Sequence, residues 1–424
     1  MKTKKLQKNI PDRWKKIRVD EIFDFLRTHA ISRDNLINGT SNGSGIGNVH
    51  YGDIHATYRS SSINLNQISV PLVKDSTFSP NTEDLLKDGD LIMADVSEDY
   101  EGIGTTVSIH GIEDKKIVGG LHTFVLRDVK KKTDERYRQY IFQNPDIRKK
   151  LKKIANGVSV YGISKSNLSK LILHIPSLSE QKRIVSVLET WDEVIEKLGR
   201  KIEAKKKVKK GLMQGLLTGK VRLSGFTDEW KSLTLGSIGQ IVTGNTPSKR
   251  VSEYYGNEFL WATALDFKGV YIKNTEIKLS DSGRAVSRVV PIGSVLVTCI
   301  ASIGKNAIAK KPMSFNQQIN AIIPNKKHNS EFIYYLIENS FHKLKEVSGG
   351  GALAMISKGV FEKIRLVFPG QKEQIAIANI LTTADNEIEA LQKKLSILKD
   401  QKKYLLNNLI TGTIRTPKTL SINA

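Results

Sequence analysis

Residues 176–222 read PSLSEQKRIVSVLETWDEVIEKLGRKIEAKKKVKKGLMQGLLTGKVR, and residues 369–415 read PGQKEQIAIANILTTADNEIEALQKKLSILKDQKKYLLNNLITGTIR. Each stretch begins with proline, continues to a Glu-Gln pair and ends near a Thr-Gly pair, with an offset of 193 positions. The match extends back to a shared Ser-Lys pair, so residues 164–222 recur as residues 357–415. An internal repeat of this size determines the architecture of the chain.

Both copies are predicted to form long amphipathic helices, because their apolar residues recur at alternating intervals of four and three. Lys205 and Lys209 fill two steps of this series in the first copy, and Lys402 fills one step in the second. The seam comprises Ile184, Leu188, Trp191, Ile195, Leu198, Ile202, Leu212 and Leu216 in the first copy, and Ile377, Leu381, Ala384, Ile388, Leu391, Leu395, Leu398, Leu405 and Leu409 in the second. Sustained over more than four heptads, this spacing indicates a coiled coil. Packing into a globular core and homodimerisation are the alternatives. Two such seams in one chain favour pairing with each other.

The predicted helix ends agree between the copies. Ser177-Leu-Ser-Glu180 is a capping box, and Glu373 keeps the acidic third position in the second copy. Gly219 and Gly412 follow the last apolar residues, where a left-handed residue commonly ends a helix. We therefore expect two helices of equal length. An antiparallel pair would span roughly 50 Å, or on the order of 15 base pairs.

Each helix follows a globular segment with strand-like and helical runs. The strand-like runs are Asp90–Asp95, Thr105–Ile109, Thr123–Leu126, Leu171–Ile175 and Gly293–Thr298, and the helical runs are Tyr137–Ile154 and Ser330–Leu344. The sequence thus predicts mixed α/β (α+β) globular domains, two in tandem, each followed by a long α-helix. The helices are expected to pair antiparallel with pseudo-two-fold symmetry. The expected domain boundaries are 1–175, 176–221, 222–368 and 369–424.

The composition favours a polyanionic partner. The chain has 424 residues, with 66 Lys and Arg against 43 Asp and Glu, and a net charge of +23. Such a net charge attracts a protein to nucleic acid, although a solvated basic surface or attraction to a membrane would also explain the charge. No run of 18 apolar residues indicates a membrane span, and no secretory signal is recognisable. The single Cys299 excludes intrachain disulfides and fits a reducing cytoplasm.

No catalytic motif is present, whether a phosphate-binding Gly-x-x-x-x-Gly-Lys loop or a zinc-binding His-Glu-x-x-His. The acids Asp95, Glu98, Asp99 and Glu101 could bind a metal, but solvated loop acids would look the same. Eight basic residues between Lys197 and Lys210 could contact phosphate or an acidic partner, or could be merely solvated.

Base reading needs donors, acceptors and planar groups on adaptable loops. The candidates in the first globular segment are Tyr51, Asp53, His55, Tyr58 and Arg59. Those in the second are Thr246, Ser248, Lys249, Arg250, Trp261, Thr263, Asn316, Gln317 and Gln318. The lysines of the repeated Ser-Lys pairs, Lys165 and Lys358, are further candidates. Packing or turn formation explains any one of these residues equally well, and Trp261 is typical of a core.

Several of these motifs resemble the specificity subunit of type I restriction-modification enzymes. They are Pro176 with Glu180-Gln181, Pro369 with Glu373-Gln374, Leu188…Asp192, Leu381…Asp385, Leu217-Thr-Gly219 and Ile410-Thr-Gly412. The second segment, with Gly244-Asn-Thr-Pro-Ser248, Trp261, Pro291-Ile-Gly293, Ile303-Gly304 and Asn316-Gln317, is similar to the target-recognition domains of that family. The first segment resembles a different class of such domains through Tyr51-Gly-Asp53.

The resemblance implies a non-catalytic chain that binds double-stranded DNA. Each domain would read one half of a split, asymmetric site, and the helices would set the number of unread bases. Two modification subunits would bring S-adenosylmethionine for adenine-N6 methylation, and restriction subunits would bring ATP-driven translocation and Mg²⁺-dependent cleavage. This chain would bind no metal or cofactor itself. The alternatives are a nuclease with an unrecognised metal site and a sequence-blind coiled-coil scaffold.

Overall fold

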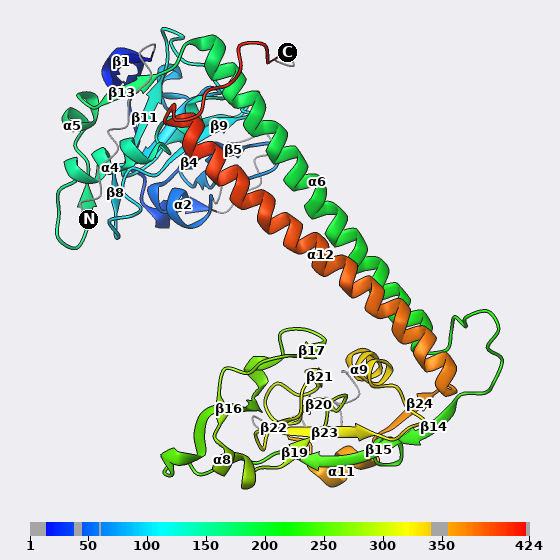
Figure 1. Cartoon of the computed structure of the whole chain (residues 1–424). Coiled ribbons are helices and arrows are strands. Elements are labelled where there is room, and N and C mark those ends of the chain that lie inside the picture. Colours follow the sequence, from blue (N-terminus) through cyan, green and yellow to red (C-terminus); the bar gives the residue numbers. More distant parts are fainter. Residues whose placement is uncertain (1–13, 38–44, 59–60, 341–354, 421–424) are drawn as a thin grey trace. The chain divides into compact units, whose positions relative to one another are not determined.

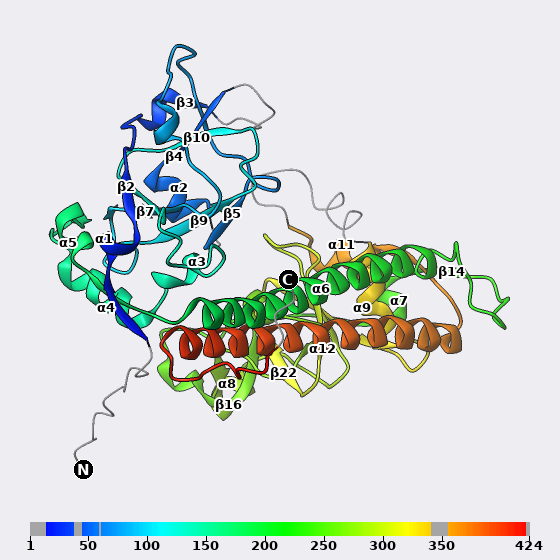
Figure 2. The same cartoon turned by 90° about the horizontal axis from the view of Figure 1, so that it is seen from above.

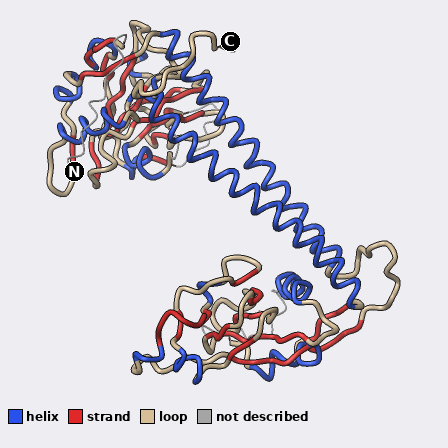
Figure 3. The backbone as a smooth tube through the Cα atoms, in the orientation of Figure 1, coloured by secondary structure: helices blue, strands red, loops and turns tan. Residues whose placement is uncertain are grey.

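The computed structural model describes residues 14–37, 45–58, 61–340 and 355–420. The candidate Arg59 and the end of the predicted helix Ser330–Leu344 lie outside these residues. The chain divides into two compact units. The first unit comprises residues 1–197 and 396–424, and the second comprises residues 198–395. We call the globular part of the first unit, up to residue 175, the first head, and residues 226–368 the second head (Figure 3).

The first head contains short strands and helices. Its strands are β1 (Lys15–Arg18), β2 (Asp24–Leu26), β3 (Leu36–Ile37), β4 (Ile46–Val49), β5 (Ser62–Asn64), β6 (Leu72–Val73), β7 (Leu91–Ala94), β8 (Val96–Ser97), β9 (Thr106–His110), β10 (Lys116–Gly119), β11 (Thr123–Arg127), β12 (Tyr161–Gly162) and β13 (Ile172–Ile175). Its helices are α1 (Val19–Ile22), η1 (Arg33–Asn35), α2 (Tyr51–Ala56), η2 (Thr82–Asp84), α3 (Arg138–Ile141), α4 (Pro145–Ile154) and α5 (Lys165–Ser169).

The second head is built in the same manner. Its strands are β14 (Lys231–Thr234), β15 (Gly239–Thr243), β16 (Tyr255–Ala262), β17 (Tyr271–Ile272), β18 (Lys278–Leu279), β19 (Val289–Val290), β20 (Val295–Thr298), β21 (Asn306–Ala309), β22 (Met313–Phe315), β23 (Ile319–Pro324) and β24 (Arg365–Phe368). Its helices are α7 (Leu235–Ile238), η3 (Ser252–Tyr254), η4 (Ala264–Asp266), α8 (Asp281–Ala285), α9 (Ser330–Asn339) and α11 (Lys358–Lys363).

The two heads share the topology of their five-stranded sheets. Each has a five-stranded sheet, in the order β2-β11-β7-β9-β5 or β15-β23-β20-β21-β17. In both sheets the first three pairings are antiparallel and the last is parallel. Each head also has a four-stranded sheet that contains one parallel pair, β4–β10 or β16–β22. The internal repeat therefore extends to the heads, although their loops have diverged.

The central strands are apolar throughout because both faces of the five-stranded sheet are covered. In β7, Leu91 and Met93 face one apolar cluster, whereas Ile92 and Ala94 face another. In β20, Val295 and Val297 face one cluster and Leu296 faces the other. A strand buried on both faces loses the apolar–polar alternation of a half-exposed strand, as these runs do.

Two long helices, α6 (Leu178–Leu216) and α12 (Gln371–Ile410), have 39 and 40 residues. Within each unit, the parts of α6 and α12 that belong to it run side by side (Figures 1 and 2). In the first unit, Ile184 and Leu188 near the start of α6 share a core with Leu409 near the end of α12. In the second unit, Leu216 near the end of α6 shares a core with Leu381 near the start of α12. The predicted antiparallel pairing is therefore confirmed within each unit.

The seam residues are all buried or partly buried, and none is fully exposed. Gly219 and Gly412, just beyond the helices, have φ values of +71° and +74°. These values match the left-handed helix ends that the sequence indicated.

The structure differs from the expected elements in two places. The predicted helix Tyr137–Ile154 is two helices, α3 and α4, because Asn144 caps α4 and Pro145 occupies its first turn. The Asn144 side chain accepts a hydrogen bond from the backbone N–H of Asp146, and proline cannot continue a preceding helix. The second difference concerns Tyr51, Asp53 and His55, which lie on helix α2 and not on a loop.

Candidate nucleic-acid interface and helix joints

The carboxyl ends of the parallel strands lie at equivalent places in the two heads. In the second head, the backbone N–H of Asn316, just after β22, donates to the carbonyl of Ala262 at the end of β16, 3.0 Å away. In the first head, the N–H of Gly120, just after β10, donates to the carbonyl of Val49 at the end of β4, 2.9 Å away. We call the surface around these strand ends the strand-end face of each head.

The strand-end face of the second head carries amide and hydroxyl groups. The Thr246 hydroxyl donates to the Oε1 of Gln317, which joins two of the predicted loops. The indole N–H of Trp261 donates to the carbonyl of Asn245, 3.1 Å away. Trp261 itself is only 4% exposed, whereas Gln317 is exposed. Trp261 therefore supports the face from beneath, and Gln317 presents its amide at the surface.

Other predicted residues surround this face. Ser248, Lys249 and Arg250 are exposed on the loop that follows Thr246. The Thr263 side chain caps η4 through the N–H of Leu265 and also bonds to Asp266. The turn at Thr263 is therefore a local structural feature.

The strand-end face of the first head carries aromatic and imidazole groups. The Tyr51 ring lies 4.6 Å from the His50 ring and 5.4 Å from the His122 ring, measured between centroids. The Nδ1 of His122 lies 3.5 Å from the Oδ1 of Asp95. Burial raises the pKa of the Asp95 carboxyl, although the neighbouring His122 opposes this shift. The exposed His55 ring bonds to the carbonyl of Val96.

Two candidates in the first head are buried beneath this surface. Asp53 is 3% exposed and accepts two 2.7 Å hydrogen bonds from Arg33. Tyr58 is 6% exposed, and burial raises the pKa of its hydroxyl. Both side chains are therefore buried on or just after α2 and do not reach the surface.

No local pattern in the sequence marks His122 and Asp95 as candidates for base reading. The N–H of Asp95 donates to the carbonyl of His122 at 3.1 Å, and the N–H of Cys299 donates to the carbonyl of Gln318 at 2.8 Å. His122 is therefore the structural equivalent of Gln318. Matching the strand that begins at Thr123 with the strand that begins at Ile319 would have revealed this equivalence, but the sequence offset between the heads differs from that between the helices.

The predicted lysines Lys165 and Lys358 open two equivalent short helices, α5 and α11. Ser164 and Ser357 cap these helices, accepting hydrogen bonds from the backbone N–H groups of Asn167 and Val360. The Nζ of Lys165 lies 5.1 Å from the Phe25 ring centroid. The Nζ of Lys358 lies 3.6 Å from the Oε1 of Glu362. Both lysines are held by neighbours within their own head.

The repeated Glu-Gln pair makes the same contacts twice. In the first unit, Glu180 forms a two-pronged ion pair with Arg415, just beyond α12. In the second unit, Glu373 binds Arg222, just beyond α6, through contacts of 2.8 and 2.9 Å. Each glutamate is almost fully buried. The predicted capping box at Glu180 is therefore only half formed, because its carboxylate is committed to Arg415 while Ser177 caps the helix.

The glutamines attach each helix to its own head. The Oε1 of Gln181 accepts from the N–H of Asp134 at 2.7 Å, and its Nε2 donates to the carbonyl of Pro176 at 2.9 Å. In the second unit, Gln374 accepts from the N–H of Asn329 at 3.0 Å and donates to Pro369 at 2.9 Å. Both amides satisfy buried backbone groups, which otherwise carry a desolvation penalty.

The repeated aspartates join the two helices. Asp192 pairs with Lys402 in the first unit, and Asp385 pairs with Lys209 at 2.8 Å in the second. Asp385 also accepts a 2.7 Å hydrogen bond from the Tyr335 hydroxyl. Lys205 pairs with Glu387 at 2.8 Å. Part of the basic run of α6 therefore neutralises acids within the second unit.

Comparison with known proteins matches residues 11–206 and 227–399 to the family described as type I restriction modification DNA specificity domain. This chain belongs to that family. The matched ranges cover both heads and most of both helices of this specificity-domain protein.

A type I restriction enzyme specificity subunit, HindI of Haemophilus influenzae, is 33% identical over 198 residues, which are 44% of this chain and 42% of that protein. The solved HsdS subunit of Thermoanaerobacter tengcongensis is 19% identical, with a TM-score of 0.53, and covers 96% of this chain and 98% of its own. A chain from a structural study of type I R-M complex assembly is 19% identical, with a TM-score of 0.63, and covers 96% and 99%. These structures share the tandem fold of this specificity-domain protein.

Within the described ranges of this specificity-domain protein, no group of three or more His, Cys, Asp or Glu residues is placed to hold a metal ion. The described helices include none that is long and apolar enough to cross a membrane.

Proposed function

We propose that this chain is the DNA-specificity subunit of a type I restriction-modification enzyme and reads a bipartite, asymmetric site with its two heads. One observation carries the proposal. The two heads share the topology of the five-stranded sheet and equivalent backbone contacts at the strand-end face. They present different side chains there, with His122 in one head where Gln318 stands in the other. A shared backbone arrangement that carries different side chains is what we expect of two heads that read different half-sites.

The proposed base-reading groups are those near the strand-end faces. They are Tyr51, His55 and His122 in the first head, and Thr246, Ser248, Lys249, Arg250, Asn316 and Gln317 in the second. Amide and imidazole groups can discriminate between base edges in the major groove, and the basic groups can contact phosphates. The positions of these groups would be held by structural residues beneath or beside them, namely Asp53, Tyr58, Trp261 and Thr263.

The chemistry is proposed to come from partner subunits. Modification subunits, two per chain, would bring S-adenosylmethionine, and restriction subunits would bring ATP and Mg²⁺. The chain itself would be a non-catalytic adaptor in the cytoplasm, with domain boundaries near residues 175, 221 and 368. No observation favours the nuclease or the sequence-blind scaffold.

The test is to purify the chain with its cognate modification subunit and to map adenine methylation on a random DNA library. Two specified half-sites separated by unread bases are expected. Methylation at a single contiguous sequence would refute the two-head proposal.

Matched head variants sharpen this experiment. Gln317→Ala should relax one half-site, and His122→Ala should relax the other, each by roughly 5- to 150-fold in discrimination at the affected base. Val129→Ala, at an exposed residue beyond the end of β11 that is opposite to His122, is the control. Relaxation of both half-sites by one variant would contradict the assignment of one half-site to each head.

A further inference from the structure

The two most exposed large apolar side chains in the part of the chain that the structure describes lie one in each head. Val158 is 92% exposed in the first head, and Leu265 is 73% exposed in the second. Single exposed apolar residues are common on protein surfaces and need no explanation. These two residues need one, because both stand on elements that adjoin the strand-end faces.

Val158 is carried by a short hairpin, residues 156–162. The backbone groups of Asn156 and Gly162 bond to each other in both directions, at 2.9 and 2.8 Å. Gly157 has a φ of +133°, and a Cβ at this position would lie 1.9 Å from the carbonyl oxygen of Val160. The backbone of the hairpin is therefore tightly turned, and the side chains of Val158 and Val160 are left exposed at its tip.

The base of this hairpin adjoins the strand-end face of the first head. Gly162 pairs with Val96 in the antiparallel β12–β8 ladder. The N–H of Ile163, just after the hairpin, donates to the carbonyl of Asp95 at 2.8 Å. The carboxylate of the same Asp95 lies beside the His122 ring. The hairpin thus extends from the surface that is proposed to read bases.

Leu265 lies on the turn that follows the parallel strand β16 in the second head. Its N–H donates to the Thr263 hydroxyl oxygen at 3.3 Å. The Asp266 carboxylate accepts from the N–H of Thr263 at 2.8 Å and from the N–H of Glu276 at 2.9 Å. The preceding residue, Ala262, accepts the hydrogen bond that defines the strand-end face. These bonds fix the backbone of Leu265 next to that face.

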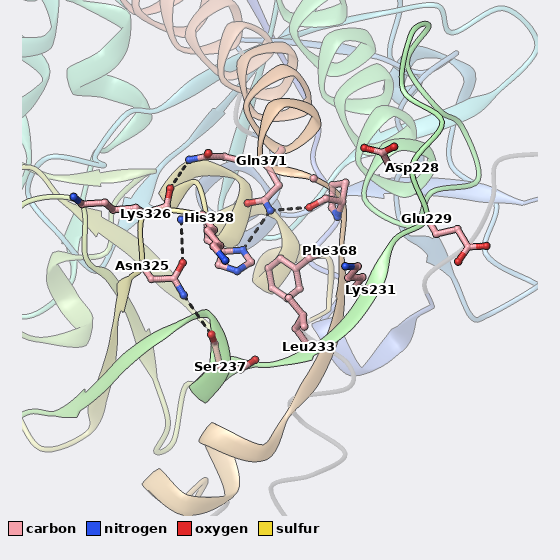
Figure 4. Close-up of a pocket in the computed structure, with 14 residues that line it drawn as sticks. Asp228, Glu229, Lys231, Leu233, Ser237, Asn325, Lys326, His328, Phe368 and Gln371 are labelled. Carbon is pink, nitrogen blue, oxygen red and sulfur yellow. Dashed lines mark hydrogen bonds between the residues drawn. The ribbon is translucent and has the colours of Figure 1, made fainter.

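The pocket at the start of α12 is a different kind of surface. It has a volume of about 1090 Å³ and is lined by Asp228 and Glu229 beside Lys231. The Gln371 amide donates to the carbonyl of Lys326 at 2.6 Å (Figure 4). Such a lining of both charges selects no ligand by its charge. The tips at Val158 and Leu265, in contrast, expose apolar surface to water, and covering that surface is favourable.

Basic side chains stand near both apolar residues. Lys149 and Lys153 are exposed on α4, which leads into the hairpin of the first head. Lys249 and Arg250 are exposed on the loop after Thr246 in the second head. Basic groups contact phosphates and position a protein on DNA, whereas contacts to base edges provide specificity. Apolar residues with basic neighbours are therefore suited to DNA.

The major groove of DNA offers one apolar group on its base edges, the 5-methyl group of thymine. We infer that Val158 and Leu265 contact thymine methyl groups, one in each half-site. Each contact adds a preference for a T·A pair over a C·G pair. This inference rests on the proposed function and adds an apolar contact in each head to the polar contacts proposed there.

The test measures DNA binding by the full chain in complex with its modification subunit, by fluorescence anisotropy. In duplexes that carry the mapped site, each thymine in turn is replaced by deoxyuridine, which pairs in the same way but lacks the methyl group. Each half-site contains an A·T pair, because adenine is the proposed methyl acceptor. At one or more thymines in each half-site, the replacement should weaken binding by about 4-fold, the factor for losing one buried methyl group.

Paired variants assign each methyl contact to a side chain. Val158→Ser should remove the difference between thymine and deoxyuridine in one half-site, and Leu265→Ser should remove it in the other. The matched controls are Val129→Ser and Ile292→Ser, at side chains that are 58% and 62% exposed. Val129 follows the end of β11 opposite to His122, and Ile292 precedes the start of β20. Both controls should keep the difference in both half-sites.

The remaining outcomes separate this inference from its rivals. Equal binding of thymine and deoxyuridine at every position would overturn it and leave the two-head proposal intact. A difference that persists in Val158→Ser and Leu265→Ser would also overturn it, because other residues would then contact the methyl groups. Loss of the modification subunit from these variants, measured by sedimentation velocity, would show that the apolar residues face a protein instead. A complex that methylates no bipartite site would refute the proposed function, and the inference with it.

Discussion

The glutamates of the repeat act through long-range ion pairs as well as through their position in the helix. Glu180 has a side chain only 4% exposed, and its partner Arg415 is 40% exposed. A buried carboxylate without a counter-ion is costly, whereas a half-exposed guanidinium can be solvated by water. Removing Arg415 should therefore lower the stability of the first unit more than removing the charge of Glu180.

Arg415→Ala should destabilise the first unit by about 3 kcal/mol, because it leaves the Glu180 carboxylate buried without its partner. Glu180→Gln should cost clearly less. Urea unfolding combined with hydrogen exchange of the first turns of α6 would measure both effects. Lys399→Ala, at an exposed lysine of α12, is the control and should change stability by less than about 0.5 kcal/mol. Equal losses from Arg415→Ala and Glu180→Gln would contradict the argument from burial.

At the scale of elements, α6 and α12 are each continuous, and an Asp–Lys ion pair joins them within each unit. Asp192–Lys402 and Lys209–Asp385 lie on either side of a central stretch that contains Glu196–Ile202 and Glu389–Leu395. A deletion of seven residues removes about two helical turns and so preserves the side that the seam presents. One heptad can therefore be removed from each helix without changing the partners at either end.

Deleting Glu196–Ile202 together with Glu389–Leu395 should shorten the gap between the half-sites. Seven residues at about 1.5 Å each are about 10 Å, which corresponds to roughly three base pairs. Methylation mapping in complex with the modification subunit would measure the gap. Deletion from α6 alone is the control and should disrupt pairing and assembly. An unchanged gap after the double deletion would show that the helices do not set the spacing.

At the scale of the whole chain, the two units contain equivalent ion pairs between α6 and α12 and the residues just beyond them. The residues in the Glu180–Arg415 and Asp192–Lys402 pairs have the same types as those in the Glu373–Arg222 and Asp385–Lys209 pairs. One head and one helix therefore carry a complete, self-complementary set of pairing groups. This arrangement is the property of a two-fold interface.

A chain of residues 1–222 should form a homodimer, with Glu180 of each copy pairing with Arg222 of the other. Its two heads would be identical, so the predicted methylated site in complex with the modification subunit is palindromic. Sedimentation equilibrium would determine the mass, and methylation mapping would determine the site. The shortened chain with Glu180→Arg, Leu188→Asp and Asp192→Lys is the control and should remain monomeric. A monomer from the unmodified shortened chain would contradict the pseudo-two-fold reading.

The sequence alone predicted the long helices and their antiparallel pairing. These features depend on local periodicity, end residues and the repeat, and the seam extends over many turns. The sequence also predicted the Thr246 and Asn316-Gln317 loops as a set, which the structure brings together through the Thr246–Gln317 hydrogen bond. The break at Pro145 could have been foreseen from proline chemistry, but the apolar pattern on both sides obscured it.

Only the tertiary structure decided which candidates reach the surface. Tyr51 and His122 meet because β4 and β10, far apart in sequence, form a parallel pair, and no local pattern encodes that pairing. Asp53 is buried and bonded to Arg33. Helix periodicity alone does not predict which polar side chain will have such a hydrogen-bond partner. Periodicity is a property of neighbouring residues, so a sequence reveals it directly. Burial and strand pairing depend on contacts between distant residues, so they emerge only when the chain is folded.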